Sequence, residues 1–185
     1  MSDRDLFALF YFTKGEPLGR LEDLVRRAGV TGARTRSWGT GVVQGAWGGL
    51  SCESHLLQLS CTTVLVVNFR EDDFHAMREG AGELIYDDGA IDLAHSFRDS
   101  CLALQPLAAF ISTYPFPMDF EVAEKQEAIV VNRDVAALVE ERFNLFYLSP
   151  DQLAELQSRE RLAARDMLPA GSGLLLFGDS GPDRW

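Results

Sequence analysis

The pattern of apolar residues predicts a strand and then a helix near the start of the chain. Residues 6–12 form a continuous apolar run, which indicates a buried strand. After a turn at residues 15–17, apolar side chains recur at helical spacing between Leu18 and Val25. Gly29 then suits the C-terminal cap of that helix, because glycine adopts the left-handed conformation without strain.

Glycine content and apolar density predict β structure up to residue 69. Residues 30–50 contain six glycines, which disfavours a helix and suits a loop or an irregular hairpin carrying Trp38 and Trp47. Residues 50–69 are dense in Leu, Val, Thr and Ser. They predict a hairpin of two long strands, the second at residues 62–69.

The clearest amphipathic pattern lies in the middle of the chain. Leu93, Phe97, Cys101 and Leu104 fall at positions i, i+4, i+8 and i+11, which makes one apolar helix face, and Pro106 ends or kinks that helix. Shorter predicted elements surround it: a helix at 71–78, a strand at 83–86 and a strand at 107–113.

The remaining residues are predicted to alternate short elements. These are a loop at 114–117, a β-like patch at 128–131, a helix at 134–142, a strand at 145–148 and a last strand at 174–177. Ser149, Pro150 and Gln152 match the N-cap, N1 and N3 positions of a helix start, so a helix is expected from there to about Met167.

This order of elements predicts one α+β domain over residues 1–178, with a mixed, largely antiparallel sheet flanked by helices. Residues 179–185 are expected to form a flexible tail. No apolar stretch reaches the roughly 18 to 20 residues of a membrane-spanning helix. The three cysteines lack C-x-x-C spacing, which predicts neither a disulfide framework nor a zinc site, and free thiols favour the cytoplasm.

The distribution of charge says more about function than the predicted elements do. The net charge of −11 argues against direct nucleic-acid binding, because affinity for phosphate backbones comes mostly from Lys and Arg. Residues 71–92, here called the acidic segment, contain eight acids and one base. Residues 1–50 contain seven bases and five acids, so the two regions differ in sign.

The sequence therefore favours a small cytoplasmic binding protein of the immunity or antitoxin type, which docks a basic protein partner such as a toxin. We expect no cofactor, no metal and no membrane contact for such a protein. The predicted partner-binding residues are Asp72, Asp73, Glu79, Glu83, Asp87, Asp88, Asp92, Trp38 and Trp47.

Two other functions stay open at this point. A small-molecule enzyme would hold a divalent metal with Asp87, Asp88, Asp92 and His95. The alternative interpretation of these residues is a turn at Asp87, Asp88 and Gly89, with Asp92 starting the next helix. An oligomeric accessory or scaffold protein would instead bury aromatic loop residues against copies of itself. These residues are Trp38, Trp47, Tyr114 and Phe116.

Overall fold

A computed structural model of the chain describes residues 6–36, 41–69, 88–112, 120–134, 137, 145–148, 167–170 and 173–177. Residues 6, 88–94, 112, 120, 145–146, 167–170 and 173–177 are described by their backbone alone. The elements in chain order are β1 (Leu6–Thr13), α1 (Leu21–Arg27), β2 (Thr31–Thr35), β3 (Val42–Trp47), β4 (Leu50–Gln58), β5 (Thr62–Phe69), α3 (Asp88–Leu104), β6 (Ala108–Ser112), α4 (Phe120–Val131), β7 (Leu145–Leu148), β8 (Met167–Ala170) and β9 (Gly173–Phe177).

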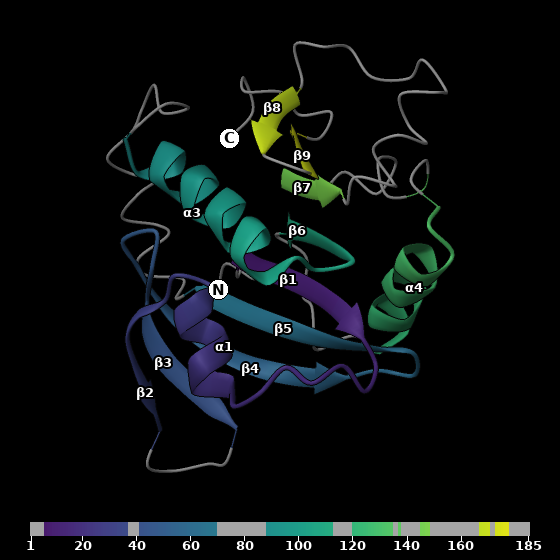
Figure 1. The fold of residues 1–185 in the computed structure, drawn as a ribbon, viewed down its shortest axis with the longest axis horizontal. Helices are drawn as coiled ribbons and strands as arrows, with labels where there is room; N and C mark the ends of the chain where they lie inside the picture. The colour runs from purple at the N-terminus through teal and green to yellow at the C-terminus, as the bar shows by residue number, and fades with distance from the viewer. Residues whose placement is uncertain are drawn as a thin grey trace, which may run out of the picture.

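The described strands form one nine-stranded sheet in the order β2-β3-β4-β5-β1-β6-β7-β9-β8. Each pairing between neighbouring described strands is antiparallel. Helices α1 and α3 lie on one face of this sheet, and α4 packs on the other (Figure 1). The predicted α+β fold class is confirmed.

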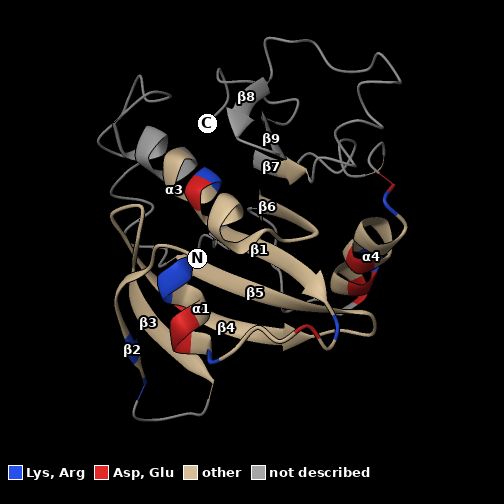
Figure 2. Cartoon of the chain, viewed as in Figure 1, with Lys and Arg blue, Asp and Glu red and all other residues tan. Residues whose placement is uncertain are grey.

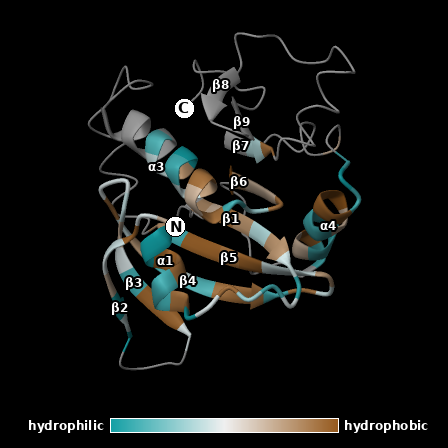
Figure 3. Cartoon of the chain, in the orientation of Figure 1, coloured by the Kyte–Doolittle hydropathy of each residue, from teal (hydrophilic) through white to brown (hydrophobic). Residues whose placement is uncertain are grey.

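The central strand β1 explains why residues 6–12 are apolar without alternation. Ala8, Phe10 and Phe12 point into the core beneath α1 and α3. Phe7, Leu9 and Tyr11 point into the core beneath α4. A strand that is buried on both faces needs apolar side chains at every position, and β1 and β5 are accordingly the hydrophobic centre of the sheet (Figure 3).

The glycine-rich segment after α1 folds as the irregular hairpin, the second of the two forms that its sequence suggests. Strands β2 and β3 pair with a change of register between Thr31 and Arg34. Gly29 has φ of 84° just after α1, as the predicted helix end requires. The predicted hairpin of β4 and β5 and the predicted helix ending before Pro106 are confirmed.

Two predictions in the second half of the chain are wrong. Residues 128–131 are the last turn of α4 and not a β-like patch, because Ala123, Glu127 and Val130 are buried at helical spacing against the sheet. Met167 begins strand β8, which the sequence did not predict, and not the end of a helix. Pro169 weakens the strand pattern there, and β8 tolerates it because it is the last strand of the described sheet.

Several other predicted elements lie outside the described residues. They are those at 71–78, 83–86, 114–117, most of 134–142, and 149–166. At the start of the predicted helix 134–142, Asp134 Oδ1 accepts a hydrogen bond from the backbone N–H of Ala137 at 3.1 Å. This contact is typical of a helix N-cap.

Gly45 in β3 is required by close packing, not by its backbone conformation. A Cβ atom at this position would lie 2.5 Å from Val30 Cγ1 and 2.7 Å from Thr31 O. We expect Gly45→Ala to lower the free energy of unfolding by about 1–3 kcal/mol, as overpacking does in other cores. Urea unfolding followed by circular dichroism measures this, and an unchanged midpoint would contradict it.

Candidate partner-binding site

Most residues of the acidic segment are outside the residues that the structure describes. Asp72, Asp73, Glu79, Glu83 and Asp87 are outside the described residues, and so is Trp38. Asp88 and Asp92 belong to the first turns of α3, where the backbone is described. The assignment of all seven acidic residues and of Trp38 to a partner-binding surface therefore stays a prediction.

Helix α3 begins earlier than the sequence predicted. Its first residue is Asp88, so Asp88 and Gly89 are helical and Asp92 lies one turn inside the helix. The anchoring of α3 by Phe97, Cys101 and Leu104, all buried, outweighs the roughly 1 kcal/mol that a glycine costs in a helix. Acidic residues in a first turn are also favoured by the helix dipole.

The side chains that the structure describes are balanced in charge. Among the side chains that the structure describes, nine are acidic and nine are basic, and both signs occur on α1, α3 and α4 (Figure 2). The whole chain nevertheless has a net charge of −11, of which residues 71–92 supply −7. Residues 71–92 therefore supply most of the net negative charge of the chain.

Trp47 is a core residue, which corrects its assignment as an exposed partner-binding anchor. Its side chain is 1% exposed and stacks on Phe69, with ring centroids 5.2 Å apart. Its indole N–H donates to the Ala28 carbonyl at 2.9 Å and to Ser100 Oγ at 3.0 Å. The side chain thus joins the end of α1 and the C-terminal half of α3 to the sheet, and it is removed from both binding and self-association surfaces.

A polar cluster at the β4–β5 turn was missed by the sequence reasoning. Glu127 of α4 is 5% exposed. Its Oε1 accepts hydrogen bonds from Cys61 N at 2.8 Å, Thr62 N at 2.6 Å and Thr62 Oγ1 at 2.7 Å. Its place in an acidic run suggests a solvated side chain, and only the helical spacing from Ala123 to Val130 signals burial.

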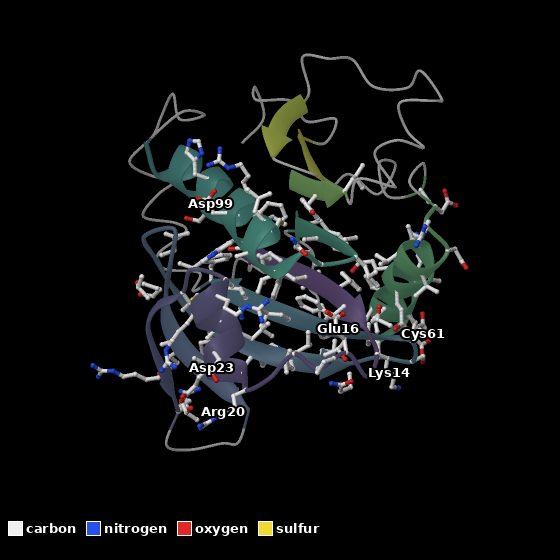
Figure 4. The ribbon with its side chains drawn as sticks, in the orientation of Figure 1. Lys14, Glu16, Arg20, Asp23, Cys61 and Asp99 are labelled. Atoms are coloured by element: carbon white, nitrogen blue, oxygen red, sulfur yellow. The ribbon has the colours of Figure 1, made fainter. Side chains whose placement is uncertain are left out.

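Lys14 completes this cluster from the other side of the turn. Its ammonium donates to the Leu59 carbonyl at 2.9 Å and to the Ser60 carbonyl at 3.1 Å, and its backbone N–H donates to Cys61 O. Lys14 and Cys61 lie together beside this turn (Figure 4). A cation therefore satisfies the carbonyls of the turn while the Glu127 carboxylate satisfies its amides.

Gln126, the residue before Glu127 in α4, adds a polar contact in the core. The Tyr11 hydroxyl donates to Gln126 Oε1 at 3.4 Å. Burial, and then the negative charge of Glu127, raise the pKa of Tyr11 far above its ordinary value. The phenol therefore stays protonated as a donor, and the arrangement fixes α4 to the sheet. Its role is structural.

The three cysteines are free thiols in different surroundings. Cys61 is exposed at the β4–β5 turn, whereas Cys52 and Cys101 are buried. Burial raises the pKa of Cys52 to about 11 and that of Cys101 well above its ordinary value. The latter two thiols are thus both shielded and protonated at neutral pH.

We expect one thiol to react rapidly in the native protein. Titration with a thiol-reactive chromophore at pH 7.5 should give about one equivalent at once and the other two only on unfolding, because the thiolate is the reacting form. Cys61→Ser should remove the rapid phase. Rapid reaction of two or three thiols in the native state would contradict the burial of Cys52 and Cys101.

Within the described residues no group of three or more His, Cys, Asp and Glu side chains is arranged to hold a metal ion. No helix of the described part of the chain has the length and apolar character to cross a bilayer. The chain matches no protein-family model, and neither a curated protein nor a solved structure is significantly similar to it.

Proposed function

We propose that this chain is a small intracellular binding protein that docks a basic protein partner through its acidic segment, most concretely an immunity or antitoxin protein that neutralises a toxin. The distribution of charge along the chain carries the proposal: residues 71–92 hold eight acids against one base, whereas residues 1–50 hold five acids against seven bases. Opposite charge accelerates association, and an array of carboxylates can occupy a basic active site in place of phosphate.

Charge reversal in the acidic segment tests this proposal. Tagged protein is used to capture partners from the native host, and the affinity of a recovered basic protein is then measured with the triple variant Asp87→Lys, Asp88→Lys, Asp92→Lys. We expect at least about a hundredfold loss of affinity, since close charge pairs at interfaces are coupled by several kcal/mol. The loss should shrink as salt is raised.

A matched control variant distinguishes the effect of where the charges are reversed from the effect of the change in net charge. Glu16→Lys, Asp23→Lys and Glu124→Lys change the net charge by the same amount at exposed positions of the described body. This variant should keep most of the affinity. Equal losses in both variants, or an unchanged affinity after reversal of the acidic segment, would reject the acidic-segment model.

The position of α3 favours a metal-dependent enzyme as the second candidate. Because α3 begins at Asp88, positions 88, 92 and 95 follow one another at intervals of four and three residues, on one side of the helix. The side chain of His95 is exposed. Carboxylate oxygens and an imidazole nitrogen are common ligands of divalent transition metals.

Metal binding distinguishes this candidate from the first. The purified protein is tested for bound metal and for a rise in melting temperature with Mg²⁺, Mn²⁺ or Zn²⁺, alongside Asp92→Asn and His95→Ala. A metal site predicts a rise that both substitutions abolish. No rise with any of the three ions would remove the enzyme model while leaving the binding model standing.

A further inference from the structure

We draw no further inference here: the strongest candidate, the polar side-chain cluster on the face of β3, β4 and β5 opposite α1, where Gln44 Nε2 donates to Glu53 Oε1 at 2.7 Å and Asn68 Oδ1 is buried without a hydrogen-bond partner among the described residues, carries no proposal because nothing in the described part of the chain shows what covers it.

Discussion

Trp47→Ala is expected to lower the free energy of unfolding by about 3–5 kcal/mol, the usual cost of removing a buried aromatic side chain. Trp47 is 1% exposed and contacts three aromatic rings: Phe69 by stacking, and Phe10 and Phe97 by edge contacts. The truncation empties the centre of the core between the sheet, α1 and α3. Urea unfolding followed by circular dichroism measures the loss.

Two further variants separate the contribution of the Trp47 hydrogen bonds from that of its buried ring. Trp47→Phe keeps a ring and removes the donor to Ala28 O and Ser100 Oγ, so about 1–3 kcal/mol of loss is expected. Leu107→Ala, at a side chain that is 37% exposed, should cost far less than Trp47→Ala. If Trp47→Ala were as stable as wild type and lost only partner binding, Trp47 would be an interface residue, which would contradict its role in the core.

Glu127→Ala should cost about 2–4 kcal/mol of unfolding free energy. One carboxylate oxygen accepts three hydrogen bonds from Cys61 and Thr62, and its removal leaves two backbone N–H groups of the β4–β5 turn without this acceptor. A buried donor that loses its partner costs about 1–3 kcal/mol. Thermal and urea unfolding measure the effect.

Substitution at a neighbouring exposed position provides the control. Glu124→Ala changes an exposed glutamate of the same helix and should alter stability by no more than about 0.5 kcal/mol. Glu127→Gln keeps an oxygen acceptor but removes the charge, so an intermediate loss is expected. If Glu127→Ala and Glu124→Ala were equally stable, the buried cluster would not contribute to the docking of α4.

The elements that the sequence predicted well are those whose own residues determine their burial. Strand β1 is apolar at successive positions because both of its faces are covered, and α3 shows one apolar face because one face is covered. Local periodicity is enough in both cases. The α+β class follows from the order of such elements along the chain.

The incorrect prediction for Trp47 and the missed role of Glu127 concern residues whose surroundings come from distant parts of the chain. Trp47 lies among glycines that suggest a surface loop, yet its hydrogen-bond partners are 19 and 53 residues away. Glu127 lies in an acidic run, yet its hydrogen-bond partners are 65 and 66 residues away. Neither contact leaves a local pattern. The end of α4 similarly has β-branched residues, and packing against the sheet overrides their strand preference.

The place of β1 in the sheet sets an order of events during synthesis. β1 is made first among the described strands, but its two neighbours end at Phe69 and Ser112. In the nascent chain, the apolar strand β1 therefore lacks both neighbours until β5 has been made. Its backbone N–H and C=O groups on the β6 side then stay unpaired while the acidic segment between β5 and β6 is translated. Strand pairing over such long sequence separations slows folding and leaves aggregation-prone intermediates exposed. A ribosome-bound fragment ending near Leu104 should accordingly depend on chaperones more than one ending beyond Ser112.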